Sequence, residues 1–404
     1  MIKPDEALKA VLETVTPIGT EQISVLDALG RVVANKIISK RDIPIKDSSA
    51  MDGYAVYAED LASDGATLKV LGVIGAGDDV SGMAIARGET YRIMTGAHLP
   101  AGADTVVERE LSDDGLQIVK ITEGKKRGAN VRPAKDDIGV GDEVDCVGEV
   151  ISPYTLSRFI SVGALHTWVY AKPRVAVIST GSEIASPEDY DNRDKMLDAN
   201  APAIIGLLKE AGADCHYLGV VPDDEAKLLA ALKTLKKYDV AVVSGGISAG
   251  DFDYMGHISE KAGLSWKFHH INQKPGKPMA FGTLDGVPIF GMPGNPVSCM
   301  FCAYFYLVPA IRKMQGMNMP ENRAVTAVLG EEVKKKKGRI QFDRVKLEVK
   351  EGVIHAYPYS SQGSNLIDSM VKCHAFMKLT DEHEGVLKVG TSVQVYIFNS
   401  SGVF

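Results

Sequence analysis

The chain has 404 residues, enough for two to four domains at roughly 100 to 200 residues each, and a formal net charge of −7. A hydrophobic fraction of 45% and a charged fraction of 24% are those of a globular protein, so disordered and fibrous architectures are excluded. The acidic balance excludes a general nucleic-acid binder, and positive charge for an anionic ligand must be local.

Helical spacing characterises the first forty residues. Apolar residues recur at helical positions from Ala7 to Val15 and again from Val25 to Val33, and the spacing returns between Pro153 and Val169. We therefore expect a discontinuous helical domain, residues 1–43 and 148–171, interrupted by a β-rich insertion, residues 44–147. The insertion is predicted from short β runs between Gly and Asp turns: Leu68 to Ile74, Thr105 to Arg109 and Leu116 to Ile121.

Residues 172–318 alternate strand and helix. The apolar run from Arg174 to Ser179 predicts a strand buried on both faces of a parallel sheet. A helix follows, with Asn200 as its N-cap and Gly212 at its end. Two further strands, Cys215 to Val221 and Asp239 to Ser244, flank a second helix. This alternation predicts a doubly wound α/β domain.

Residues 319–404 return to β texture and predict a small separate barrel or sandwich. Its expected strands are Ala324 to Leu329, Arg339 to Val349, His374 to Leu379 and Ser392 to Phe398. Before them, the uncharged apolar run from Val297 to Ile311 is shorter than the roughly 18 residues that span a bilayer, so it predicts a buried helix.

The five cysteines are odd in number and scattered, which does not fit a secreted disulfide framework. The N-terminus, Met1 to Glu6, carries acids and lacks the apolar core of a signal peptide. We therefore expect a cytoplasmic protein with neither a membrane nor a nucleic-acid partner. The CxxC of Cys299 and Cys302 lies in the apolar run and is expected to pack in the core.

The segments that follow the strands hold the candidate chemistry, because ligands bind beyond the carboxyl ends of a doubly wound sheet. They are rich in glycine and carboxylates, and one is basic. That combination suits a phosphate held by backbone N–H groups and lysines, bridged to carboxylates by a hard divalent cation. The segments are Thr180 to Glu183, Pro222 to Asp224, Ser244 to Asp253, Lys274 to Lys277 and Pro293 to Pro296.

Several of these residues also have a purely structural explanation. A helix cap accounts for one of Asp223 and Asp224, and the sequence leaves open which. The glycine run after Ser244 matches neither the Rossmann nor the Walker A pattern, so a dehydrogenase and a P-loop ATPase lose support. The lysines around Pro275-Gly276 are better explained by a bound anion than by solvation, whereas Lys334 to Lys337 is expected to be a solvated hairpin face.

Three loops in the N-terminal half complete a set of seven ordered motifs. Together the motifs resemble the molybdopterin molybdenumtransferases, the MoeA family, which includes the C-terminal domain of gephyrin. The motifs are Ser49 to Tyr54, Ile93 to Gly96, Arg132 to Ile138, Ser179 to Glu183, Ser244 to Gly246, Lys274 to Pro278 and Pro293 to Val297.

The resemblance implies a homodimer of elongated four-domain subunits, each with a MogA-like molybdopterin-binding α/β domain and a small C-terminal β-barrel. Family members insert molybdate into adenylylated molybdopterin and release AMP with the aid of Mg²⁺. Their cleft lies between the β insertion of one subunit and the α/β and C-terminal domains of the other. A molybdopterin adenylyltransferase is a further expected partner.

The resemblance also implies site residues. The expected catalytic residues are Asp52, Glu183, Asp253 and Lys274, and the expected metal ligands are Glu183, Asp223, Asp224 and Asp253. The expected substrate-binding residues are Thr95, Arg132, Asp137, Ser244, Gly245, Gly246, Lys277, Pro293, Pro296 and Ser364.

Some choices stay open at this stage. The sequence does not decide between molybdate and tungstate, nor which carboxylate binds Mg²⁺ and which the oxyanion. His270 stands where relatives often carry a basic residue, so charge at that position is expected to depend on pH. A nucleotidyltransferase that makes the adenylate, and a non-enzymatic scaffold, are the alternative functions.

Overall fold

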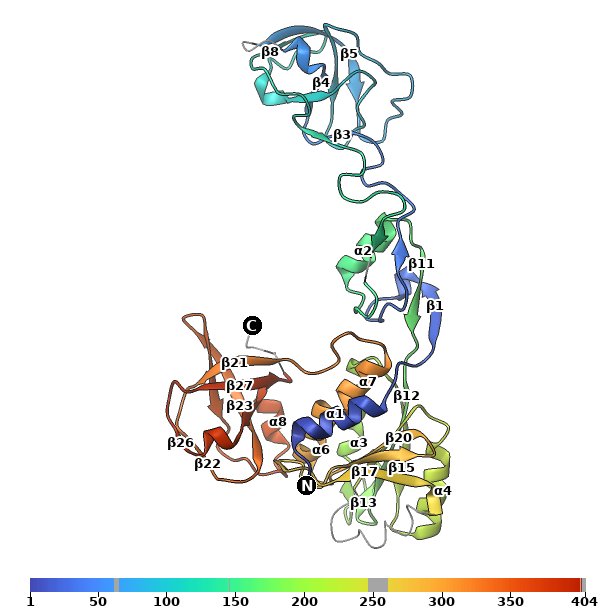
Figure 1. Ribbon diagram of the computed structural model, residues 1–404, viewed down its shortest axis with the longest axis vertical. Coiled ribbons are helices and arrows are strands. Elements are labelled where there is room, and N and C mark those ends of the chain that lie inside the picture. Colours follow the sequence, from blue (N-terminus) through green and yellow to red (C-terminus); the bar gives the residue numbers. More distant parts are fainter. Residues whose placement is uncertain (62–64, 145, 246–260, 400, 402–404) are drawn as a thin grey trace.

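A computed structural model describes the chain except for residues 62–64, 145, 246–260, 400 and 402–404. The molecule is elongated (Figure 1): the β insertion lies at one end, a small unit with α2 follows, and the α/β layer and the C-terminal β structure lie side by side at the other end. No helix among the described residues is long and apolar enough to cross a membrane.

The central layer is a six-stranded sheet of order β15-β12-β16-β20-β19-β17. Its first four strands are parallel, and β19 runs antiparallel to both of its neighbours, β20 and β17. Every residue of β16 is buried, as the continuous apolar run predicted. The doubly wound fold is confirmed. The strands are β12 Arg174–Thr180, β15 Asp214–Val221, β16 Val240–Ser244, β17 Leu264–His269, β19 Ala280–Leu284 and β20 Val287–Met292.

Helices cover both faces of this sheet. Val175 and Val177 share one core with α1 Pro4–Thr14, α3 Asn200–Glu210, α6 Pro296–Cys302 and α7 Val308–Met314. Ala176 and Ile178 point the other way and pack against α4 Glu225–Leu235. A π-helical turn, Ala303–Leu307, joins α6 to α7, so the buried helix expected over this run is confirmed with a local irregularity.

The N-cap expected of Asn200 is wrong. Asn200 is already helical, and Asp198 Oδ1 accepts hydrogen bonds from the backbone N–H groups of Asn200 and Ala201, both at 3.1 Å. Asp198 is 5% exposed and also accepts a hydrogen bond from the Tyr217 hydroxyl at 2.9 Å. The capping carboxylate therefore lies two residues earlier than the sequence signal indicated.

The helix expected over Val25 to Val33 is also wrong. A 3-10 turn, Val25–Asp27, occupies its start, with Ser24 Oγ accepting from Leu26 N. Gly30 then adopts a left-handed φ of 76°, and Val32 and Val33 form bridges to Val150 and Val169. A turn followed by extended backbone happens to place apolar residues at helical spacing.

The rest of this unit mixes short strands with one helix. Its core includes Val25, Val33, Phe159 and Val169. Strand β1 Thr20–Ser24 pairs with β11 His166–Tyr170, so the second half of the helical stretch expected at 153–169 is a strand. The remaining elements are α2 Pro153–Ser161, β2 Ile37–Ile38 and β10 Glu143–Val144.

The β insertion is a five-stranded sheet of order β7-β4-β6-β5-β8, with cores on both faces. A short pair, β3 Ser48–Ser49 with β9 Val131–Arg132, lies at the end nearer α2 (Figure 1). The strands are β4 Gly53–Val56, β5 Ala66–Ile74, β6 Glu89–Ile93, β7 Thr105–Glu108 and β8 Ile118–Ile121, with 3-10 turns Ala58–Asp60 and Arg109–Leu111.

The C-terminal strands close into a five-stranded barrel, because β23 pairs with both β24 and β25. β18 Gln273–Lys274, from the α/β part of the chain, adds to the barrel edge by parallel pairing with β23. The barrel elements are β21 Ala324–Leu329, β22 Val333–Lys335, β23 Ile340–Lys350, β24 Val353–Pro358, α8 Asp368–Lys372, β25 Ala375–Leu379, β26 Gly385–Leu387 and β27 Ser392–Ile397.

Candidate active site

Two loops at the carboxyl edge of the sheet are locked together. Ser182 N donates to Asp223 Oδ2 at 2.9 Å, and Asp223 N donates to Ser182 Oγ at 3.2 Å. The next residue, Asp224, instead caps α4, with its Oδ1 accepting from Lys227 N at 2.9 Å. The helix cap is therefore Asp224, and Asp223 is the carboxylate that faces the neighbouring loop.

This division of roles gives a paired prediction. Asp224→Ala removes an N-cap and is expected to lower the free energy of unfolding by about 1 kcal/mol, since an orphan N–H of α4 loses its acceptor. Asp223→Asn keeps the loop hydrogen bonds in reach and is expected to leave stability within about 0.5 kcal/mol. If Asp223 is the Mg²⁺ ligand that the resemblance implies, this variant needs more Mg²⁺ for activity. Chemical denaturation and a Mg²⁺ titration separate the two, and equal stability losses would contradict the assignment.

The loop after β16 needs a glycine at its first position. Gly245 has φ +83°, and a Cβ there would lie 2.4 Å from the Thr180 carbonyl oxygen. The preceding Ser244 is buried, and its Oγ accepts a hydrogen bond from Asn200 Nδ2 at 3.1 Å. The same Nδ2 donates to Gly294 O at 2.8 Å, so Asn200 ties this loop to the one between Pro293 and Pro296. Gly246 and Asp253 lie outside the described residues.

The carboxylates at this edge of the sheet decide whether a metal ion could bind there. Glu183 is exposed and makes no side-chain hydrogen bond or ion pair with the described part of the chain. Across the described residues, no group of three or more His, Cys, Asp or Glu side chains is arranged to hold a metal. Mg²⁺ commonly takes only one or two protein carboxylates, with waters and substrate phosphates completing its shell. Glu183 and Asp223, on loops that touch, fit that requirement.

The turn from Lys274 to Lys277 lines a pocket of about 620 Å³ between the α/β layer and the barrel, called here the lysine pocket. Lys274, Lys277 and Ser364, all predicted, meet there, while Pro293 and Pro296 flank the pocket residue Asn295. Ser364 is held by its backbone, since its carbonyl accepts from Val297 N at 3.1 Å. Asn295 comes from the predicted segment Pro293 to Pro296, whereas sequence reasoning missed Arg339 and Ser298.

The pocket is strongly positive. Lys274, Lys277 and Arg339 are exposed to it, and none of them forms an ion pair with a described residue. The nearby carboxyl of Asp343 is 4% exposed, and burial raises its pKa although Lys274 and the hydrogen bonds from Gln341 oppose the shift. Three unpaired cations beside hydroxyl and amide groups make a site for an oxyanion or phosphate.

A second cluster forms in the β insertion, at the ends of β3, β4 and β6. Asp52 Oδ1 accepts from both the backbone N–H and the hydroxyl of Thr95, each at 2.7 Å. These hydrogen bonds, helped by Arg109 and Arg92, lower the pKa of Asp52, so the carboxylate is ionised at neutral pH. Arg132 pairs with Ser48, which lies four residues before Asp52 in the chain. The predicted Asp52, Thr95 and Arg132 are thus brought to one region.

Asp137 stands apart from this cluster. Its backbone N–H donates to Ile43 O at 3.0 Å, and its side chain lines a pocket of about 260 Å³ with Tyr154 and Arg158 of α2. It therefore lies where the insertion meets the unit that contains α2. Its substrate-binding role stays a prediction.

Within one subunit the two clusters do not meet. The insertion strands β3 and β4 lie at one end of the molecule, and β20, α6 and the barrel lie at the other (Figure 1). The motifs of the N-terminal half and the lysine pocket therefore require a second copy of the chain if they act on one substrate.

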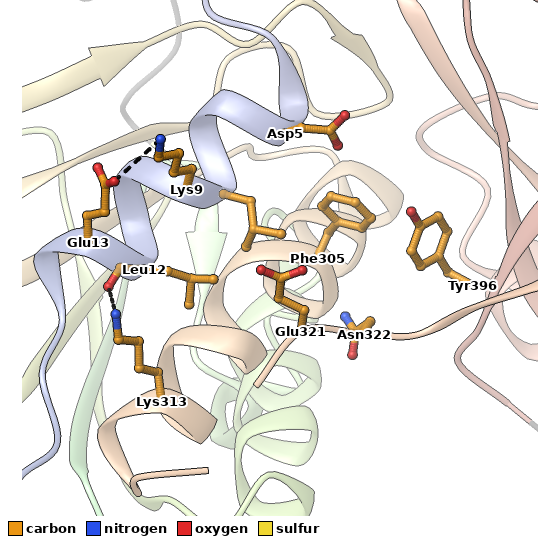
Figure 2. A pocket seen from close by; sticks show the side chains of 10 residues that line it. Asp5, Lys9, Leu12, Glu13, Phe305, Lys313, Glu321, Asn322 and Tyr396 are labelled. Carbon is orange, nitrogen blue, oxygen red and sulfur yellow. Dashed lines mark hydrogen bonds and ion pairs between the residues drawn. The ribbon is translucent and has the colours of Figure 1, made fainter. Parts of the chain in front are cut away.

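Another pocket, of about 400 Å³, separates α1 and α7 from β27 (Figure 2). It contains none of the predicted residues. Its charges are largely paired: Glu13 pairs with Lys9 at 3.7 Å, Asp5 pairs with Lys378 at 2.9 Å, and Lys313 donates to Leu12 O at 2.6 Å. An anionic substrate is disfavoured there by comparison with the lysine pocket.

The CxxC cysteines are structural. Cys299 and Cys302 are fully buried in the core, and burial raises both thiol pKa values, that of Cys299 to about 12. Core packing is confirmed. His270 adopts a left-handed φ of 63°, next to the partly buried His269, whose pKa is lowered by burial.

Three regions of the chain match known protein families. Residues 2–163 match the family described as MoeA N-terminal region (domain I and II), residues 176–313 a probable molybdopterin binding domain, and residues 326–398 the MoeA C-terminal region (domain IV). The α/β layer and its anion pocket thus belong to a molybdopterin-binding protein.

Full-length relatives narrow this class. The chain is 33% identical to a molybdopterin molybdenumtransferase of Haemophilus influenzae over 99% of both chains, and 30% identical to that of Bacillus subtilis over 98% of this chain and 94% of the relative. A solved molybdopterin biosynthesis MoeA protein from Pyrococcus horikosii superposes with a TM-score of 0.82 at 31% identity, covering 99% of each chain. The chain belongs to the MoeA family of molybdopterin molybdenumtransferases.

Proposed function

We propose that the protein transfers molybdenum from molybdate to adenylylated molybdopterin, with Mg²⁺-dependent release of AMP. The observation that carries the proposal is the pocket in which Lys274, Lys277 and Arg339 meet beside Ser364. It opens next to the strand-end loops of an α/β domain of the molybdopterin-binding type. A tetrahedral oxyanion and a phosphate-bearing pterin can thus be held side by side.

The pocket residues have distinct tasks in this proposal. Lys274 and Lys277 neutralise the oxyanion as point charges, and Arg339 supplies a planar fork of donors. Ser298 and Asn295, at the start of α6, add uncharged polar groups. Because the ammonium groups are already in place, they stabilise negative charge that develops on the phosphoanhydride without reorganising.

The carboxylates act at the neighbouring edge. Glu183 and Asp223 would hold Mg²⁺, with Asp253 as a further proposed ligand. The ion, when bound, supplies Lewis-acid stabilisation of phosphate charge. Asp224 caps α4 through its side chain, so it is the weakest of the four metal-ligand predictions.

A homodimer completes the proposed site. Asp52, Thr95 and Arg132 of one subunit would face the lysine pocket of the other, which accounts for two polar clusters at opposite ends of one chain.

The proposed domains remain 1–43 with 148–171, 44–147, 172–318 and 319–404. Five free cysteines support a cytoplasmic location, and an adenylyltransferase that supplies the substrate is the proposed partner.

The test is an AMP-release assay. Purified protein is incubated with adenylylated molybdopterin, with molybdate and Mg²⁺ each present or omitted, and AMP is quantified by chromatography. We expect AMP only when all three are present, and a parallel series with tungstate measures oxyanion preference. If ATP and molybdopterin instead yield pyrophosphate, the protein makes the adenylate, and the proposal is wrong.

A further inference from the structure

In the lysine run 334–337, three side chains face solvent and one faces inward. Val333 and Lys335 of β22 point inward, and the side chains of Lys334, Lys336 and Lys337 are exposed. The hairpin face predicted for this run is therefore solvated except at Lys335, which is 1% exposed. Lys335 Nζ lies 3.5 Å from Asp381 Oδ1 and 3.3 Å from Lys336 O, and this buried anchor fixes which lysines face outward.

The outward lysines have no counter-ion within the described chain. Some surface cations elsewhere are paired, such as Lys36 with Glu143 and Lys372 with Asp368. The turn beside β22 does carry Asp381, Glu382 and Glu384, but only Asp381 is within ion-pair distance of a lysine, and that lysine is the buried Lys335. The strip formed by Lys334, Lys336 and Lys337 thus keeps its positive charge available.

Along the chain, this strip runs up to Arg339, a residue that lines the pocket of Lys274 and Lys277. Lys337 and Arg339 are two residues apart, so their Cα atoms lie within about 8 Å. Arg339 lines the pocket, and the next residues of β23 pair with Gln273 and Lys274. The acids Glu331 and Glu332 lie at the other end of β22, away from Arg339 in the chain. Along the chain, positive charge therefore extends from Arg339 through the strip and reverses sign at Glu331 and Glu332.

A chain of net charge −7 repels a polyanionic ligand at long range. A local strip of unpaired cations that continues a positive pocket reverses this field along one approach path and raises the association rate.

We propose that Lys334, Lys336 and Lys337 form a capture strip that guides the phosphate-bearing substrate into the pocket of Lys274, Lys277 and Arg339. The inference rests on the proposed function for the identity of the substrate. It goes beyond it by separating capture from chemistry: the strip sets the association rate, and the pocket sets the rate of turnover.

The test compares two triple variants. Lys334→Glu, Lys336→Glu and Lys337→Glu together reverse the strip. Lys209→Glu, Lys233→Glu and Lys237→Glu together change the net charge equally, using exposed lysines at the carboxyl-terminal ends of α3 and α4, the sheet edge opposite the ligand. Stopped-flow pterin fluorescence gives the association rate of adenylylated molybdopterin, and AMP release gives kcat.

At low ionic strength the strip variant is expected to associate about tenfold more slowly than the parent, with kcat unchanged, while the control variant slows much less. In 0.5 M salt the Debye length falls to about 4 Å, so the difference is expected to vanish. Equal slowing of both variants, or a loss that persists at high salt, would overturn the capture strip. Binding without AMP release from the parent would overturn the proposed function alone, and no binding to the parent would overturn both.

Discussion

Lys274→Met is expected to lower kcat/KM for AMP release by about 100- to 1,000-fold, the cost of removing one preorganised charge-stabilising donor. Methionine keeps the unbranched apolar stem and deletes only the ammonium group. Lys274 is exposed at the pocket and has no ion-pair partner among the described residues, so the fold should not depend on its charge. The KM for molybdate is expected to rise as well, because the oxyanion loses a cation.

The matched control is Lys267→Met, an exposed lysine on the nearby strand β17. It removes the same charge from the same part of the chain without touching the pocket, and it should keep parent-like kinetics. Steady-state AMP release at varied molybdate measures both variants, with thermal unfolding to verify the fold. If Lys274→Met and Lys267→Met behave alike, the pocket is not the reaction site.

Phe301→Ala is expected to lower the free energy of unfolding by about 4 kcal/mol, the cost of a large cavity in a well-packed core. Phe301 is fully buried on α6, and its ring lies 4.7 Å from that of Phe342 and 5.0 Å from that of Phe376, both on barrel strands. The ring thus joins the barrel to the α/β layer. Because Asn295 and Ser298 line the pocket from the α6 side, while Arg339, Ser364 and the β23-paired Lys274 lie on the barrel side, a looser joint should also raise the KM for molybdate.

Phe159→Ala provides the comparison. Phe159 is equally buried, but it lies in the core around α2, away from the pocket. It should destabilise the protein by a similar amount while leaving the KM for molybdate unchanged in the folded enzyme. Urea denaturation and steady-state kinetics at a temperature where both variants are folded measure the two effects. An unchanged KM in Phe301→Ala would show that the joint does not shape the pocket.

The strands of the α/β layer could be predicted because each is an uninterrupted apolar run, such as Arg174–Thr180, which only burial on both faces explains. The helix predicted from Val25 to Val33 is absent, because a turn followed by extended backbone gives the same spacing of apolar residues. Local periodicity reports burial on one side, and it does not report which backbone geometry achieves it.

The site was predictable in its motifs and not in its contacts. Asp52 and Thr95 were each expected from their own loops, but their hydrogen bonds join residues far apart in sequence. Arg339 was missed because only the pairing of β18 with β23 brings it to the lysine turn. The choice between Asp223 and Asp224 likewise needed the loop contact with Ser182, which no spacing rule contains.

The proposed homodimer places Asp52 of one subunit and Lys274 of the other in one active site. Its most direct test is complementation: Asp52→Asn and Lys274→Met chains, each inactive alone, are co-expressed with different tags and the heterodimer is purified. A site shared between subunits leaves one of two sites intact, so AMP release should return to about half that of the parent. A site built within single subunits leaves both damaged, and a heterodimer as inactive as its parents would contradict the account.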